Sequence, residues 1–197
     1  MTEPHEIVTR QIGEISRQIE NLAGADVSKK VMEGKEETIA TKDPAKGALW
    51  IKEAIDRLDV LIDEKTRKEI MTACGRFCNM VNSKYMEEMK DVRRKYATEE
   101  EFLKTLLQPG EGPARFEKDG NDLILYYTPR KVGQGIRCFC YLINMLPEDV
   151  NASPTYCQCS RGFVQAHWEG VFGRPLEVEL GKTALTGAEE CQFIIHL

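Results

Sequence analysis

The sequence has little of what exported, membrane-spanning and nucleic-acid-binding proteins need. No apolar run is long enough for a membrane span or for the core of a secretory signal, and the first twenty residues are polar and charged. With 27 lysines and arginines against 32 acidic residues, the chain also lacks the positive charge that phosphate backbones attract. We therefore expect a cytoplasmic protein with neither a nucleic-acid partner nor a membrane partner.

Histidine is scarce as well, with 3 residues in the chain. A nucleophilic cysteine needs a base beside it, and His167 lies two turns after Cys159 on a predicted helix, too far for direct contact. We interpret His167 and Trp168 as ordinary helix positions, one exposed and one packed. The sequence also contains no glycine-rich phosphate loop, repeat or low-complexity tract. A cysteine–histidine enzyme would thus need a base from another element.

Cysteine is the reactive residue type that is plentiful, with 7 in 197 residues. Because no export signal is present, we expect the thiols to be reduced, and the odd number argues against complete disulfide pairing. The count therefore points to metal or thiol chemistry, although buried, inert thiols are the alternative. The candidate metal ligands are Cys74, Cys78, Cys138, Cys140, Cys157, Cys159 and Cys191.

Helical periodicity dominates the N-terminal half. One apolar stripe fits a helix that begins at Pro4 and ends at Gly24. The stripe consists of Val8, Ile12, Ile15, Ile19 and Leu22. Core packing is one use of this stripe, and pairing with a second copy in a homodimer is another. Residues 26–42 favour a short helix or a solvated connection.

Two longer helices are predicted next, over residues 44–62 and 64–81, with Asp63 as the N-cap of the second. Cys74 and Cys78 lie one turn apart on the apolar face of that second helix. Two sulfurs so placed can supply half of a metal site, or they can fill the core. A capping box beginning at Thr98 predicts a further helix, which ends before residue 109.

Strand patterns begin after residue 110. Residues 114–118 and 122–128 are two predicted strands joined by a turn at Asp119–Gly120. Ile136–Leu142 is a predicted strand, on which Cys138 and Cys140 would share one face.

The C-terminal part predicts a helix and a hairpin. The helix covers residues 160–172 and ends at Gly173. Alternating apolar residues from Leu176 and again from Cys191 predict two antiparallel strands around a turn at residues 186–188. The fold class is therefore α+β, with N-terminal helices packed on an antiparallel sheet that has a C-terminal helix and hairpin.

We divide this chain into an N-terminal helical segment, residues 1–43, and a cysteine-rich α+β ligand-binding part, residues 44–197, which together form one compact domain.

Several side chains near these elements are candidates for chemistry. Cys157 and Cys159 come just before the predicted helix, where the helix dipole would lower a thiol pKa and make either residue a nucleophile or a soft metal ligand. Arg161 can hold a ligand carboxylate, or it can be a solvated surface residue. Tyr126, together with Tyr127 and Tyr141, can line an aromatic pocket or the edge of a core.

The cysteine spacings narrow the choice of cofactor. Neither Cys-x-Cys nor Cys-x-x-x-Cys matches the twin Cys-x-x-Cys of a zinc ribbon, so the metal signal comes from three cysteine pairs in one small domain. The spacings fit no iron–sulfur run. Zinc is therefore the expected cofactor ahead of an iron–sulfur cluster.

The run Cys157-x-Cys159-Ser160-Arg161-Gly162-Phe163, followed by Gly173–Leu180, Gly187 and Cys191-x-Phe193, resembles the 4-vinyl reductase domain superfamily. These small-molecule-binding domains are related in fold to vesicle-tethering subunits of the TRAPP complex and occur in sensor modules of aromatic-responsive bacterial regulators. With its Cys74-Gly75-Arg76-x-Cys78 segment, the whole chain is also similar to an uncharacterised prokaryotic branch near the L-2-amino-thiazoline-4-carboxylic acid hydrolase-like proteins.

The first resemblance implies a zinc site. In the sensor domains, zinc is held by a cysteine before the helix, a glutamate on the first hairpin strand, a cysteine soon after it, and a last cysteine across the turn. Cys157 or Cys159, Glu179 and Cys191 match three of these ligands. Thr183 stands near the expected position of the middle cysteine and cannot replace a thiolate. The zinc site would therefore need its missing ligand from Cys74, Cys78, Cys138 or Cys140.

Three functions follow as hypotheses. The first is a sensor-like domain that binds a small molecule or a metal through its cysteines without turnover. The second is a hydrolase of a small sulfur- or nitrogen-containing ring, with Cys157 or Cys159 as nucleophile or metal ligand. The third is a structural homodimer. A separate prediction is geometric: the Cys74 and Cys78 face should lie against the Cys157-x-Cys159 segment, with the sheet receiving that helix face, so that cysteines of both segments converge on one site.

Overall fold

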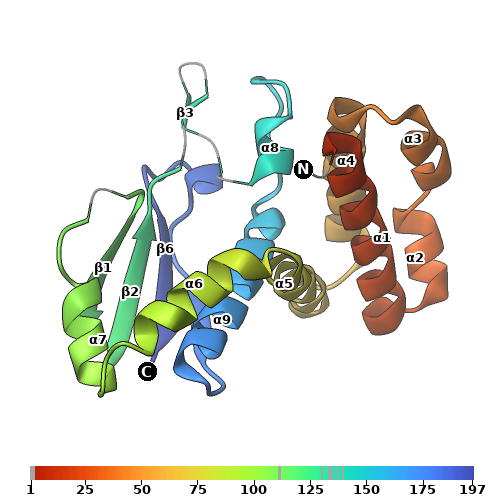
Figure 1. Cartoon of the computed structure of the whole chain (residues 1–197). Coiled ribbons are helices and arrows are strands. Elements are labelled where there is room, and N and C mark those ends of the chain that lie inside the picture. Colours follow the sequence, from red (N-terminus) through yellow and green to blue (C-terminus); the bar gives the residue numbers. More distant parts are fainter. Residues whose placement is uncertain (1–2, 111, 130, 133–134, 137, 139) are drawn as a thin grey trace.

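Helices make up the N-terminal half of the chain, and a four-stranded antiparallel sheet comes from the C-terminal half, which confirms the predicted α+β class (Figure 1). The computed structural model describes residues 3–110, 112–129, 131–132, 135–136, 138 and 140–197. The helices are α1 Pro4–Ala23, α2 Ala25–Val31, α3 Lys35–Thr41, α4 Pro44–Leu61, α5 Glu64–Val81, α6 Ser83–Arg93, α7 Glu99–Leu106, α8 Tyr141–Asn144 and α9 Cys157–Phe172, with 3₁₀ turns η1 Pro154–Tyr156 and η2 Ala184–Thr186.

The sheet has the strand order β1-β2-β6-β5, and every neighbouring pair in it is antiparallel. Its strands are β1 Ala114–Asp119, β2 Asp122–Tyr127, β5 Glu177–Leu180 and β6 Cys191–His196; a separate short ladder pairs β3 Lys131–Val132 with β4 Gly135–Ile136. Both predicted hairpins are confirmed. Gly120 has a φ of 56°, the left-handed conformation that a tight turn between β1 and β2 requires.

The predicted caps of α5 and α7 and the predicted end of α9 agree with the structure. Asp63 caps α5 by accepting a hydrogen bond from the Thr66 N–H at 3.0 Å. Thr98 and Glu101 form the predicted capping box of α7. Gly173 ends α9 with a φ of 69°. These caps are decided within four residues of chain, which is why the sequence alone could locate them.

Two predicted segments differ from the structure. Residues 26–42 form parts of two short helices, α2 and α3, rather than one weak helix. The strand predicted over Ile136–Leu142 is wrong at its end, because Tyr141–Asn144 is helical; residues 137 and 139 lie outside the described part. Leu142, Ile143 and Leu146 are all buried, and that spacing is helical rather than alternating.

The apolar side chains form two cores. A helical core draws on α1, α4, α5, α8 and the segment before α9, and a sheet core draws on α7, α9 and the four-stranded sheet. Helices α5, α6 and α9 lie between the sheet and the α1–α4 group (Figure 1). Trp168 of α9 anchors the sheet core, with its ring 5.5 Å from Phe116 in an edge-to-face contact.

The stripe on α1 belongs to the helical core. Val8, Ile12, Ile15 and Ile19 are buried within the chain, while Leu22 is exposed. This burial supports core packing as the use of the stripe, and a homodimer stays a prediction. The boundary predicted at residue 43 likewise stays a prediction, although side chains from both sides of it share the helical core. No helix in the described ranges is long and apolar enough to cross a membrane.

Helices α5 and α9 cross with their backbones in contact. A Cβ atom on Gly75 would lie 1.9 Å from the carbonyl oxygen of Cys159, and one on Gly162 would lie 2.0 Å from the carbonyl oxygen of Thr72. The bidentate pair of Arg76 with Glu169, at 2.8 and 2.9 Å, holds the crossing at its far end. The Gly75 side of α5 therefore packs on α9, and its buried Ile70, Met71 and Cys74 join the helical core rather than, as predicted, a surface of the sheet.

We predict that Gly75→Ala destabilises the protein by at least about 1–3 kcal/mol, because the added methyl group must push two helix backbones apart. Gly13→Ala is the matched control: Gly13 also lies inside a helix, and nothing stands within 4 Å of the added atom, so alanine should stabilise by about 0.5–1 kcal/mol. Urea denaturation measures both. Equal stability of the two variants would contradict the crossing.

The outer face of the sheet contains a histidine between two carboxylates. His196 Nδ1 lies 2.8 Å from Asp122 Oδ1, and Nε2 lies 3.2 Å from Glu179 Oε1. The hydrogen bond to Asp122 is the largest cause that raises the His196 pKa above 6.5, and the contact with Glu179 adds to it. The protonated ring thus joins β2, β6 and β5.

We predict that this histidine makes stability depend on pH. Because the folded-state pKa is raised, its contribution is fully present below about pH 6.5 and is lost as the pH rises through the folded-state pKa. Urea unfolding of the wild type and of His196→Gln at pH 6 and pH 9 measures the effect, with His5→Gln as control. The difference between the two pH values should shrink in His196→Gln only, and shrinkage in both variants would contradict the assignment.

Candidate functional site

Helix α9 begins earlier than predicted, at Cys157, and the 3₁₀ turn η1 leads directly into it. Ser153 starts this turn by accepting a hydrogen bond from the Thr155 N–H at 3.1 Å, and Pro154 occupies the first position, which favours a helix start. Cys157 and Cys159 therefore lie in the first turn of α9 and not in a loop before it. The Ser153–Pro154 pair was the sequence signal for this start.

All seven cysteines are free thiols in this structure. Cys74, Cys138, Cys157 and Cys191 are buried, and Cys78, Cys140 and Cys159 are half-buried. The predicted contact of the α5 cysteine segment with the start of α9 is confirmed, since the Cys159 carbonyl packs on Gly75 and Cys159 shares the helical core with Cys74.

Cys140 packs in the helical core together with Cys74, Cys138 and Cys159, and its N–H donates to the Cys138 sulfur at 3.4 Å. A charge on Cys140 would help to raise the pKa of Cys78, Cys138, Cys157 and Cys159, in each case after the larger effect of burial, and for Cys157 after the effect of Cys191 as well. The Tyr156 hydroxyl also hydrogen-bonds the Cys140 sulfur. Sequence reasoning missed Tyr156, a buried side chain that adds a polar group to an otherwise apolar interface.

The prediction of a low thiol pKa at the start of α9 is wrong. Burial raises the pKa of Cys157 from 9.0 to about 11, and burial together with nearby cysteines raises that of Cys159 well above 9.0. At this position, burial destabilises the thiolate more than the helix dipole stabilises it. At neutral pH both side chains are therefore protonated thiols.

A second group of side chains joins α9 to the C-terminal hairpin. The Cys157 thiol donates to the Thr183 hydroxyl at 3.5 Å, and the Cys191 sulfur accepts from the Ala184 N–H at 3.4 Å. Thr183 is buried between α9, which carries Cys157, and β6, which carries Cys191. The superfamily resemblance implies a third thiol near this position. Sequence spacing from Glu179 could place this residue but could not show its contact with Cys157.

The zinc set implied by the superfamily does not fit these residues. Glu179 points to the outer face of the sheet, where it contacts His196, whereas Cys191 points to the buried face. Thr183 offers a hydroxyl in place of a thiolate. Two of the four expected ligands are therefore unsuitable, because β5 alternates its side chains between faces and Glu179 falls on the wrong one.

No three His, Cys, Asp or Glu side chains of the described residues are arranged so that they could hold a metal ion. Six of the cysteines instead lie on α5, α9 and the segment before α8, and Cys191 lies on β6 in the sheet core. In this state they act as small core side chains, and convergence on one ion would require rotation of their side chains.

The other predicted site residues have structural contacts. The Arg161 guanidinium donates to the Thr72 hydroxyl at 2.7 Å and to the Val178 carbonyl at 3.4 Å, so this half-buried side chain bridges α5 and β5. The Arg115 guanidinium lies over the Tyr126 ring, with its Cζ atom 3.7 Å from the ring centre. Tyr127 packs against the sheet core, and Tyr141 is exposed on α8. The three tyrosines therefore lie in separate environments.

His167 corrects another prediction. Both His167 and Trp168 are buried, with their rings perpendicular and 5.3 Å apart. Burial, with a smaller effect of Lys90, lowers the His167 pKa to about 4. The imidazole is therefore neutral at physiological pH, and it lies two turns along α9 from the cysteine pair.

Comparison with known proteins gives a family match and distant structural matches. No match was found among curated proteins. A crystal structure of an H-NOX protein from S. oneidensis in the Fe(II)NO ligation state has 14% sequence identity and a TM-score of 0.41, with 95% of this chain and 96% of that chain covered. So low a TM-score carries no argument about function. The chain belongs to DUF6144, a family of unknown function whose pattern matches residues 6–197.

Proposed function

We propose that this chain is a sensor-like binding domain, with no turnover of its own, in which the cysteine cluster around Cys140 takes up a thiophilic metal ion. The observation that carries the proposal is that Cys74 of α5, Cys138 and Cys140 before α8, and Cys159 of α9 pack in one core, with the Cys140 N–H 3.4 Å from the Cys138 sulfur. Close packing requires only small side chains, so it does not explain why three segments each contribute a thiol to the same core.

The chemistry of thiols supports a soft or borderline metal. Thiolates prefer zinc and copper(I) to magnesium or calcium, and a tetrahedral zinc site needs sulfurs at about 2.3 Å from the ion. Since the sulfurs are not arranged in this way without metal, binding would rotate cysteine side chains and release their protons. The proposed ligands come from α5, α9 and the segment before α8, and Glu179 has no part.

The resemblance to the 4-vinyl reductase domain superfamily supports binding rather than catalysis, because that superfamily binds small molecules. A small-molecule ligand and a homodimer stay predictions beside the metal proposal. The hydrolase hypothesis draws no support from the thiols: Cys157 has a raised pKa, and His167 is neutral and two turns away. Cys157 and Cys159 are therefore proposed as metal ligands rather than as nucleophiles.

We predict that protein purified without chelators, or loaded with zinc after purification, carries about one metal ion per chain and unfolds at a higher temperature than the metal-free form. Native mass spectrometry and thermal unfolding measure the two effects. Cys140→Ser should abolish uptake, because it removes the central sulfur. Cys191→Ser is the matched control and should retain uptake, because Cys191 packs in the sheet core and Cys140 packs in the helical core.

Two results would overturn this proposal. If the protein is purified without metal and its stability does not change when zinc or copper(I) is added, the cluster does not bind a metal ion. Loss of binding in Cys191→Ser with retention in Cys140→Ser would instead locate the ion beside Thr183, at the superfamily's position.

Thiol reactivity separates binding from nucleophilic catalysis. We predict that iodoacetamide labels Cys157 at pH 8.5 on the order of 100-fold more slowly in the native protein than in urea, because its pKa of about 11 leaves little thiolate. Cys159, with its pKa raised well above 9.0, should also be slow. Peptide mass spectrometry gives the rates. Fast labelling of either residue below pH 8 would restore the hydrolase hypothesis.

A further inference from the structure

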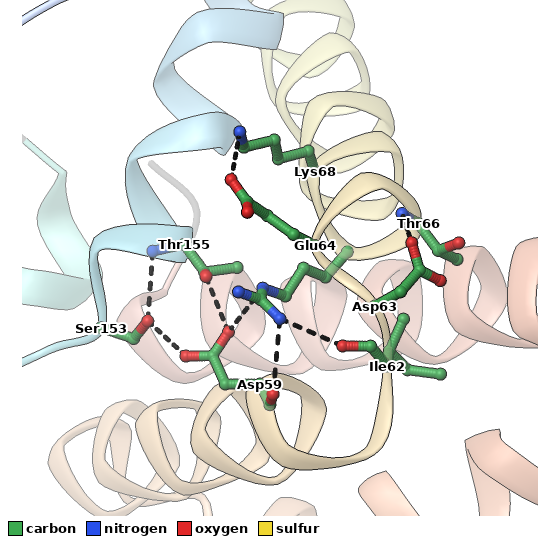
Figure 2. Close-up of polar contacts among 9 residues, drawn as sticks. Asp59, Ile62, Asp63, Glu64, Thr66, Lys68, Ser153 and Thr155 are labelled. Atoms are coloured by element: carbon green, nitrogen blue, oxygen red, sulfur yellow. Dashed lines mark hydrogen bonds and ion pairs between the residues drawn. The ribbon is translucent and has the colours of Figure 1, made fainter.

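A polar cleft of about 360 Å³ opens where α4 ends, α5 begins and η1 leads into α9 (Figure 2). Pro154 is the one lining residue without a charged or hydrogen-bonding side chain. The lining residues are Asp59, Glu64, Arg67, Lys68, Ser153, Pro154, Thr155 and Gln158. The volume lies within the range of small-molecule sites, and the lining suits a polar ligand.

Asp59 organises the floor of the cleft. Its carboxylate accepts hydrogen bonds from the Ser153 hydroxyl and, at 2.6 Å, from the Thr155 hydroxyl, and it pairs with Arg67 Nε at 3.3 Å (Figure 2). Both carboxylate oxygens are thus occupied by donors from the chain itself. Asp59 fixes the cleft's shape, and its negative charge is already balanced by Arg67.

Donors remain available after these contacts. Arg67 Nη1 donates to the Ile62 carbonyl at 3.1 Å and to the Asp59 carbonyl at 3.4 Å, but no hydrogen bond within the described part of the chain uses Nη2. The Gln158 amide has no hydrogen bond to the described residues either. Lys68 pairs with Glu64 alone, and both side chains are largely exposed. The cleft therefore offers a guanidinium edge, an ammonium and an amide.

The ion pair of Lys68 with Glu64 indicates what these donors hold. The Glu64 carboxylate pairs with the Lys68 ammonium at the rim of the cleft, and an ion pair so exposed to water is weak, so an external oxyanion can replace it. A carboxylate or phosphate can then accept from Lys68, from Arg67 Nη2 and from Gln158 together, and bonds to charged donors are the strong ones.

From this geometry we propose that the cleft binds the carboxylate or phosphate group of a small polar molecule. Arg67 and Lys68 supply the charge, Gln158 orients the group, and Asp59 holds Arg67 and η1 in place. The site and the cysteine cluster are neighbours in sequence, because Ser153 and Thr155 come just before Tyr156 and Cys157. However, the site shares no side chain with the cysteine cluster. Its occupancy is therefore measured independently of metal binding.

The test is an NMR titration of the full chain with sodium phosphate and, separately, sodium acetate, each compared with sodium chloride at equal ionic strength. The backbone amides of Ser153, Thr155 and Gln158 should show saturable shifts. Lys68→Ala should weaken binding by about five- to tenfold, because one charge-assisted hydrogen bond is lost. Glu64→Gln should strengthen it, because the competing carboxylate is removed.

Lys65→Ala is the matched control, since it removes the same charge from the first two turns of α5 at an exposed position outside the cleft. It should bind as the wild type does. Saturation by phosphate alone or by acetate alone would identify the group that the cleft selects. The proposal fails if neither salt gives saturable shifts beyond those of chloride, or if Lys68→Ala and Lys65→Ala bind alike.

Discussion

The backbone crossing of α5 and α9 is the constraint on which the rest of the structure depends. Helix α9 contributes side chains to the sheet core, and α5 contributes to the helical core, so their contact joins the two. Gly75 and Gly162 permit the contact, because any larger side chain would meet a carbonyl oxygen of the other helix. Small residues are therefore required along this line, and Cys74 and Cys159 satisfy that requirement beside the glycines.

The same close packing explains the state of the thiols. A crossing without room for water makes each thiolate costly, and the pKa of Cys74, Cys78 and Cys159 rises as a result. Alanine or serine would have met the need for a small side chain equally well. The gathering of cysteines from three segments around Cys140 is thus left without a packing reason, which is why metal binding is the function we propose.

Sequence patterns predicted the elements whose causes are local. The stripe on α1, the Asp63 cap of α5 and the Thr98 capping box each depend on a few neighbouring residues, and their predicted positions agree with the structure. The site depends on contacts between distant segments. Nothing near Glu179 in sequence shows that its side chain points away from Cys191, and nothing near Cys159 shows that it packs on Gly75.

The turn η1 connects the two proposed sites within five residues. Its N-cap Ser153 and its second residue Thr155 are held by Asp59 at the cleft, while Tyr156 hydrogen-bonds Cys140 and Cys157 begins α9. Successive side chains of a 3₁₀ turn are rotated by about a third of a circle, so adjacent residues can contact opposite sides of one short segment. The Asp59 contacts therefore hold one side of η1 while Tyr156 packs against the cysteines on another.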